Sequence, residues 1–221
     1  MPGQYAPTSI VGRLSVLVAA RGEHPYLRAK RMLDILISLL LLPVVMPVLA
    51  ALAIAIRLDS SGPIMFKQER TGHHGRRFGM YKFRTMVENA EELKAGLAHL
   101  NILPPPDFKI IDDPRITRVG RFLRKTSLDE LPQILNVLRG EMSLVGPRPT
   151  SFAPDTYVLW HTARLEVLPG ITGLWQLKGR NASTFDERLR LDVEYISRMS
   201  IAYDLKLIAL TVLSVVRGSG A

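Results

Sequence analysis

The sequence predicts an α+β fold that is mainly helical, and three observations lead to this prediction. One long apolar block lies in the first third of the chain. Segments 64–70 and 76–85 are rich in β-branched and aromatic residues and flank a glycine-containing turn, which is the pattern of a small β-hairpin. Several of the remaining segments place apolar residues at helical spacing. With 221 residues, the chain suits one domain with a substantial core.

The composition narrows the partners and the chemistry. Lys and Arg number 29 against 20 Asp and Glu, so the formal net charge is +9 and the expected partners carry negative charge. Nucleotide phosphates, anionic lipids and nucleic acids all meet this condition. The chain has no cysteine, which excludes disulfides, thiol nucleophiles and thiolate metal sites.

The apolar block runs from Ile35 to Ile56 and contains 22 residues without a charge. As a straight helix it would be about 33 Å long, which matches the hydrocarbon thickness of a bilayer. No polar stripe runs along it for water to contact, which argues against the core helix of a soluble protein. We therefore expect a membrane segment.

The block can cross the bilayer or enter and leave by the same face. Arg28, Lys30 and Arg31 precede it and Arg57 follows it, so a straight span would place one basic cluster outside the cell, against the positive-inside tendency. Pro43 and Pro47 lie in the middle of the block, and each removes a backbone donor, which favours a sharp bend. We favour a re-entrant helix-break-helix over a span.

The remaining helices are predicted from spacing. Residues 88–100 form a helix and 103–107, with three prolines, a loop. Four arginines at steps of three are expected on one helical face that attracts phosphates or lipid headgroups, unless it is only a solvated basic face; they are Arg115, Arg118, Arg121 and Arg124. A short amphipathic helix ends at Gly140, and two more lie within 192–216, of which 201–216 is apolar enough for a membrane interface.

Two adjacent acids, Asp129 and Glu130, open the helix that ends at Gly140. Ser127 and Glu130 have the spacing of a capping box, so these residues are explained equally well by helix capping. The helix dipole would also keep Asp129 ionised, as a carboxylate nucleophile requires. Neighbouring side chains point about 100° apart on a helix, so one acid can attack while the other holds a cation.

Two further segments offer anion-binding groups. Arg148 lies between Pro147 and Pro149, whose fixed φ angles reduce the entropy lost when the guanidinium binds an anion. Trp175 follows a glycine-rich turn. Two roles for its ring stay open, which are packing in the core and forming an aromatic platform for a sugar or uracil.

The chain resembles the monotopic phosphoglycosyl transferases, which are bacterial sugar transferases, from about Lys30 to its C-terminus. The resemblance rests on an ordered set of segments rather than on one motif. They are KRMLD, FKQERTG, KFRTM, DPRITRVGRFLRKTSLDELPQILNVLRGEMSLVGPRP, PGITGLWQLKGRN and the late LDVEY and DLKL. One departure concerns the bend, where Met46 takes the place of the serine that commonly precedes the family's proline.

The resemblance implies that sugar-1-phosphate is transferred from a UDP-sugar to polyprenol phosphate with release of UMP, in the first membrane step of glycoconjugate or exopolysaccharide assembly. Carried over by motif, Asp129 is the nucleophile that forms a covalent aspartyl phosphosugar, and Glu130 is the catalytic partner that engages Mg²⁺. Four basic residues are expected around the phosphates, namely Lys82, Arg124, Arg148 and Arg180.

The resemblance also implies a division of the chain and a location. Residues 1–29 form an N-terminal extension, 30–57 the re-entrant helix with its bend at Pro43 and Pro47, and 58–221 a catalytic domain on the cytoplasmic face of the bacterial inner membrane. Membrane lipid is an expected partner and nucleic acid is not. The sequence leaves open whether the protein forms a homodimer.

Two other functions stay open at this point. A non-catalytic, basic, membrane-anchored binding protein explains the charge and the apolar block but gives Asp129, Glu130 and Arg148 no task. A metal-dependent hydrolase of sugar nucleotides would use both acids only as metal ligands.

Overall fold

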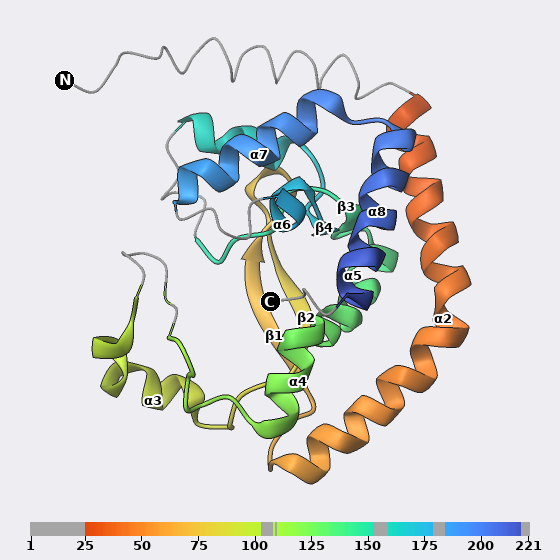
Figure 1. Cartoon of the computed structure of the whole chain (residues 1–221). Helices are drawn as coiled ribbons and strands as arrows, with labels where there is room; N and C mark the ends of the chain where they lie inside the picture. Colours follow the sequence, from red (N-terminus) through yellow and green to blue (C-terminus); the bar gives the residue numbers. More distant parts are fainter. Residues whose placement is uncertain (1–24, 103–107, 109, 153–158, 179–183, 218–221) are drawn as a thin grey trace, which may run out of the picture.

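The computed structural model describes residues 25–102, 108, 110–152, 159–178 and 184–217. The N-terminal residues 1–24, the predicted loop 103–107 and Arg180 lie outside the described residues. The fold is mainly helical with a small antiparallel hairpin, as the sequence predicts. Figure 1 shows the hairpin in the middle of the molecule, with the long N-terminal helix α2 along one side, α8 between α2 and the body, and α7 across one end.

Helix α2 spans Pro25–Asp59 without interruption, with Pro43 and Pro47 inside it. The break expected at these prolines is therefore absent, because the helical hydrogen bonds on either side of them continue. Figure 1 shows instead that the helix changes direction along its length. A proline removes one backbone donor and clashes with the preceding turn, and the helix accommodates this by bending.

Most of the apolar surface of α2 is not covered by the rest of the described chain. Leu36, Leu40 and Val44 are 63%, 74% and 67% exposed. Within residues 26–59, the most apolar stretch of 18 residues has a mean hydropathy of 2.8, and 6% of it is buried. The interpretation as a soluble core helix is wrong, and the length and composition suit association with a membrane.

One narrow stripe of α2 is polar and faces the body of the protein. Lys30, Asp34 and Ser38 follow one another at steps of four and are 8%, 3% and 0% exposed. Lys30 Nζ lies 2.7 Å from an oxygen of Asp204, and Asp34 Oδ1 accepts a hydrogen bond of 3.1 Å from the Leu144 amide. Buried polar groups require such partners, so Lys30 and Asp34 fix the start of α2 against the rest of the fold.

The end of α2 docks by apolar contacts. Ile56 is 2% exposed and forms a cluster with Phe83 of the hairpin and Leu123 of α4. Leu52 and Leu49, one and two turns earlier, pack against the same cluster. Both ends of the apolar helix are therefore attached to the same body.

Two small sheets organise that body. Strands β1 (Met65–Thr71) and β2 (Arg77–Phe83) pair antiparallel, which confirms the predicted hairpin. Strands β3 (Ser143–Val145) and β4 (Gly170–Thr172) pair in parallel. Three-residue strands lack the alternation by which a strand is predicted, so the second sheet was not expected.

Helices and 3-10 turns connect and cover these sheets. In chain order they are η1 (His73–Gly75), α3 (Ala90–Gly96), η2 (Ala98–Leu100), α4 (Arg118–Thr126), η3 (Leu128–Gln133), α5 (Ile134–Arg139), η5 (Leu159–Glu166), α6 (Leu174–Lys178), α7 (Phe185–Arg198) and α8 (Ile201–Val216). The predicted stop at Gly140 is confirmed, with a φ of 80° that glycine adopts readily. The two predicted C-terminal helices are α7 and α8.

The basic helical face is only partly present. Helix α4 begins after Thr117, whose hydroxyl accepts a hydrogen bond of 3.0 Å from the Gly120 amide, so Arg115 lies outside the helix. Arg115 is instead buried, and its Nη2 lies 2.6 Å from Asp113 Oδ2. Arg118, Arg121 and Arg124 remain on α4.

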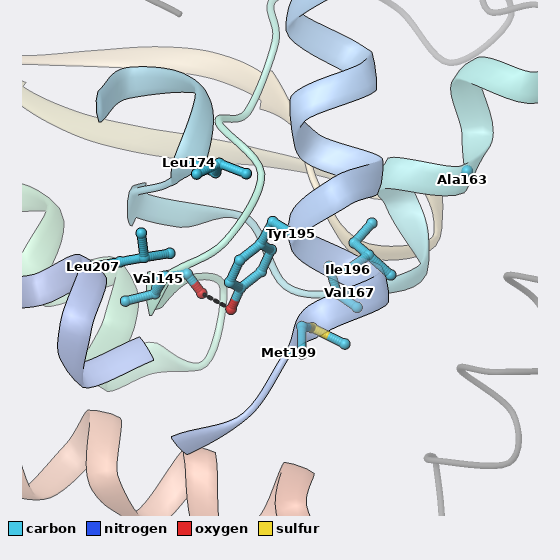
Figure 2. Close-up of a cluster of buried hydrophobic side chains, with 8 residues drawn as sticks. All are labelled: Val145, Ala163, Val167, Leu174, Tyr195, Ile196, Met199 and Leu207. Carbon is cyan, nitrogen blue, oxygen red and sulfur yellow. Dashed lines mark hydrogen bonds between the residues drawn. The ribbon is translucent and has the colours of Figure 1, made fainter. Parts of the chain in front are cut away.

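A core cluster joins the second sheet to the C-terminal helices, as Figure 2 shows. Its buried members are Val145, Ala163, Val167, Leu174, Tyr195, Ile196, Met199 and Leu207. The Tyr195 hydroxyl lies 3.1 Å from the Val145 carbonyl and 2.7 Å from Asp204 Oδ1. Asp204, which also binds Lys30, therefore links α2, α7 and α8 next to strand β3.

We predict that Lys30→Met destabilises the protein by about 3–5 kcal/mol, because it leaves the carboxylate of Asp204 buried without its cation. Chemical unfolding of the protein in detergent measures this change. Lys206→Met is the control, since Lys206 is exposed on α8 and should lose little stability. Equal loss in both variants would show that the buried ion pair does not fix α2.

Candidate active site

The two acids lie on η3, directly after a reversal of the chain. Helix α4 ends at Ser127, which has a φ of 57° in the left-handed region, and η3 starts at the next residue. The Ser127 side chain makes no capping hydrogen bond. The capping-box interpretation is therefore wrong, because Ser127 ends one helix and Glu130 has other partners.

Glu130 is held by two cations. Lys82 Nζ lies 2.9 Å from Glu130 Oε1, and Arg148 Nη1 donates to Oε2 at 3.0 Å. Arg148 Nη2 also contacts Oε1. Burial by itself would raise the pKa of Glu130, but Arg148 and Lys82 outweigh it and hold the pKa well below its ordinary value. Glu130 is thus a fixed negative charge.

Strand β2 and helix α5 position Lys82. The fully buried Asn136 accepts a hydrogen bond of 3.0 Å from the Tyr81 amide and donates one of 2.9 Å to the Gly79 carbonyl. These bonds fasten α5 to the strand at Gly79 and at Tyr81, the residue directly before Lys82. The hydrogen bonds of Asn136 therefore fix the position of Lys82 relative to η3.

A tight crossing of backbones positions Arg148. The Gly146 amide donates to the Thr172 carbonyl and the Gly170 amide to the Pro147 carbonyl, each at 2.9 Å. A Cβ on Gly146 would lie 2.5 Å from the Leu168 carbonyl oxygen, so only glycine allows this approach. The proline-flanked arginine predicted as an anion-binding group is thereby anchored beside Glu130.

Asp129 differs from its neighbour in having weaker contacts. Its Oδ2 lies 4.0 Å from Lys82 Nζ, which is its one ion-pair contact within the described part of the chain. Burial raises the pKa of Asp129 above its ordinary value and Glu130 adds to this, while Lys82, Arg148 and Arg124 oppose it. Burial, the largest of these influences, therefore opposes the expectation that the helix dipole keeps Asp129 ionised.

The structure gives a different outcome for each of the other two predicted basic residues, Arg124 and Arg180. Arg124 Nε donates to Thr85 Oγ1 at 2.9 Å. Within the described residues Arg124 forms no ion pair with either acid, although its charge opposes the rise in the pKa of Asp129. Arg180 lies outside the described residues. Lys82 and Arg148 are therefore the two predicted basic residues that the structure brings into contact with the acid pair.

A half-open pocket adjoins the acid pair, with Arg148 in its wall. Arg70, Arg164 and Arg188 also line it, together with Trp175. The guanidinium carbons of Arg148 and Arg188 each lie 5.9 Å from the centre of the Trp175 ring, within the range of a cation–π contact. Trp175 is thus a wall of a cationic pocket rather than core filling.

The acids are a poor metal site by themselves. Among the described residues, no group of three or more His, Cys, Asp or Glu side chains converges. Both oxygens of Glu130 already contact Lys82 or Arg148. Mg²⁺ commonly binds one or two carboxylates together with substrate phosphates, so the residues fit the ion only when a diphosphate supplies further oxygens.

The comparison with known proteins identifies the family. The model of the bacterial sugar transferases matches residues 25–218. The chain belongs to this family. The match includes η3, the hairpin and the Arg148 loop, so the family predicted from the ordered segments is confirmed.

Three relatives illustrate this bacterial sugar transferase family. The galactosyl transferase CpsE of Streptococcus agalactiae is 48% identical over 203 residues, which cover 90% of this chain and 44% of the relative. The UDP-glucose:undecaprenyl-phosphate glucose-1-phosphate transferase of Escherichia coli is 40% identical over 192 residues, 83% of this chain and 39% of the relative. The exopolysaccharide production protein ExoY of Sinorhizobium fredii is 38% identical over 200 residues, 87% and 88% of the two chains.

The chain spans less than half the length of the first two relatives and most of the length of ExoY. What these proteins share with it is therefore the part that contains the acid pair.

Sequence reasoning missed two residues that support the site. Arg164 and Asp192 form a buried ion pair with 2.8 Å between Nη2 and Oδ2. Arg164 carried no recognised pattern. Asp192 belongs to the LDVEY segment, whose acid at an otherwise buried helix position was the available signal.

The two acids should respond oppositely to neutralisation. The raised pKa of Asp129 means that its contribution to stability is greatest at low pH and is lost as pH rises through the folded pKa. At neutral pH, Asp129→Asn should therefore leave the free energy of unfolding unchanged or increase it.

The pKa of Glu130 is lowered, so its contribution is present at neutral pH and is lost only in strong acid. Glu130→Gln should cost about 3–5 kcal/mol, because Lys82 and Arg148 lose their buried counter-charge. Denaturant unfolding of both variants checks the pair. A larger loss for Asp129→Asn than for Glu130→Gln would contradict the assigned charges.

Proposed function

We propose that the protein transfers sugar-1-phosphate from a UDP-sugar to polyprenol phosphate, most simply undecaprenyl phosphate, and releases UMP. The observation that carries this proposal is the contrast between the two acids. Glu130 contacts Lys82 and Arg148 at short range, whereas Asp129 lies 4.0 Å from Lys82 and forms no closer ion pair among the described residues. The names of the relatives, which include a galactosyl transferase and an undecaprenyl-phosphate glucose-1-phosphate transferase, support the substrate classes.

In the first step, an ionised Asp129 oxygen attacks the β-phosphorus of the UDP-sugar. The bond between that phosphorus and the bridging oxygen breaks, and UMP leaves with the electron pair. Lys82 and Arg148 lie beside the reacting oxygens and offset the charge that develops on them, which is the kind of stabilisation that a fixed cationic site supplies.

In the second step, an oxygen of polyprenol phosphate attacks the phosphorus held on Asp129. The acyl phosphate bond breaks, the carboxylate returns to its initial state, and a polyprenyl diphosphate sugar is formed. Holding the phosphosugar covalently means that the soluble donor and the lipid acceptor need not be bound together.

The pocket beside Arg148 suits the nucleotide part of the donor. Arg70 and Arg188 also line it and can contact phosphate oxygens, while the Trp175 ring offers a face for a planar base. Arg148 belongs both to this pocket and to the acid pair, so a donor bound in the pocket has its diphosphate next to Asp129.

We further propose that Mg²⁺ accompanies the diphosphate and is held by Glu130 together with phosphate oxygens. The ion would offset charge on the departing nucleotide. Asp129 and Glu130 carry two negative charges against three positive charges on Lys82, Arg148 and Arg124, so the protein alone has no excess negative charge to attract the ion.

We propose that α2 enters and leaves the cytoplasmic face of the bacterial inner membrane. Its first turns are fixed by Lys30 to Asp204, and its last turns pack on Phe83 and Leu123. Attachment of both ends to one body supports a bent, re-entrant course over a span. The same course places the acid pair near the interface, where the acceptor phosphate lies.

The family match excludes the binding-protein alternative and leaves hydrolysis to be distinguished. We predict that brief mixing with a UDP-sugar and Mg²⁺ gives protein heavier by one sugar phosphate, measured by intact-protein mass spectrometry. Asp129→Asn should give no adduct and at least about 10³-fold slower UMP release, because an amide is a poor nucleophile.

Arg190→Lys serves as the matched active control, since Arg190 is exposed on α7. A donor panel that includes UDP-galactose and UDP-glucose identifies the sugar. Turnover by the unmodified protein without any adduct would point to hydrolysis or direct transfer and would overturn the covalent step.

The topology has a separate test. The chain has no natural cysteine, so Gly3→Cys and Ser183→Cys each introduce a single labelling site. Both should be labelled in intact cells only by a reagent that crosses the inner membrane, because a re-entrant helix keeps both flanks in the cytoplasm. Labelling of Gly3→Cys alone by an impermeant reagent would show that α2 spans the membrane.

A further inference from the structure

The backbone of the Arg148 loop is held by an unusual mixture of partners. The carbonyls of Pro147 and Thr150 accept hydrogen bonds of 2.9 Å from the backbone amides of Gly170 and Thr71. The carbonyl of Arg148, between them, accepts instead from the guanidinium of Arg164. The residue whose side chain binds Glu130 is therefore the one whose backbone depends on a charged side chain.

The same Nη2 atom of Arg164 that contacts the Arg148 carbonyl also forms an ion pair. Its guanidinium Nη2 lies 2.8 Å from Asp192 Oδ2, and both side chains are at most 5% exposed. Its guanidinium carbon also lies 6.0 Å from the centre of the Phe185 ring. A planar guanidinium with a carboxylate on one edge, an aromatic ring nearby and a carbonyl as a further acceptor has little freedom to reorient.

The partners of Arg164 separate its task from that of the other pocket arginines. Arg148 and Arg188 lie near the Trp175 ring, where a bound donor would meet them. Arg164 directs its donors at two internal acceptors, one of them the Arg148 backbone. These contacts indicate that Arg164 holds the backbone of Arg148 in place and does not itself bind the ligand.

We propose that Arg164, held by Asp192, is a positioning residue for the transferase. It fixes the Arg148 loop in the position in which the Arg148 guanidinium binds Glu130. The inference rests on the proposed function. It gives a task to the acid of the LDVEY segment, which lies on α7 and makes no described contact with Asp129 or Glu130.

The test is a double-mutant cycle with Arg164→Lys and Arg148→Ala. Lysine keeps the charge but replaces the rigid, planar guanidinium, whose Nη2 contacts both the carbonyl and the carboxylate, by a flexible ammonium group. The rate of adduct formation at saturating UDP-sugar is measured by rapid quenching and intact mass, above the pKa of Asp192, which burial raises to about 6 against the opposing charges of Arg164 and Arg188.

If Arg164 acts through Arg148, Arg164→Lys slows adduct formation about 10-fold or more in the natural background, the range seen when a supporting contact is lost. In the Arg148→Ala background it changes the rate by less than about 2-fold, because the residue that it positions is gone. Arg190→Lys, on the exposed face of α7, leaves both rates unchanged.

An equal loss in both backgrounds would overturn the proposal, because it would mean that Arg164 acts independently of Arg148 through general stability or direct ligand contact. If Arg164→Lys does not fold, Asp192→Asn replaces it in the same cycle, since it keeps Arg164 and the side-chain shape. If the natural protein turns over without an adduct, the covalent mechanism fails, and the cycle measured on UMP release still decides the role of Arg164.

Discussion

The ion pairs of Glu130 with Lys82 and Arg148 are the contacts on which the rest of the site depends. They bring together a hairpin strand, a 3-10 turn and a proline-flanked loop that are far apart in the sequence. A buried carboxylate needs such partners, and once it has them its neighbour Asp129 is left with a raised pKa and weaker contacts. Two adjacent acids thus acquire different chemistry from their surroundings alone.

The structure around Glu130, Lys82 and Arg148 is held together mostly by buried hydrogen bonds and ion pairs. Asn136 fastens the strand of Lys82 to α5, and Asp204 joins Lys30 of α2 to Tyr195 beside strand β3. The membrane-associated helix α2 is thereby connected to strand β3, which precedes Arg148 in the chain. The connection consists of hydrogen bonds as well as apolar contacts. This connection gives a physical reason why a soluble nucleotide donor and a lipid acceptor can be handled at one position.

The sequence predicted what depends on local pattern. The apolar length of 35–56, the alternation in the hairpin and the turn at Gly140 follow from spacing, and the ordered motifs indicated the family. The acid pair and two of its cations, Lys82 and Arg148, were named correctly as neighbours. The capping interpretation of Ser127 failed because a left-handed residue ended α4 early. Arg164 was missed because its role depends on a backbone carbonyl, which has no sequence signature.

The most direct test of the central claim is to locate the phosphosugar on the protein. An acyl phosphate is reduced by borohydride to an alcohol, so brief mixing with UDP-sugar, reduction and peptide mass spectrometry should show homoserine in place of Asp129 and an unchanged Glu130. A reduced side chain at Glu130, or at any other carboxylate, would contradict the division of tasks that the ion pairs of Glu130 impose.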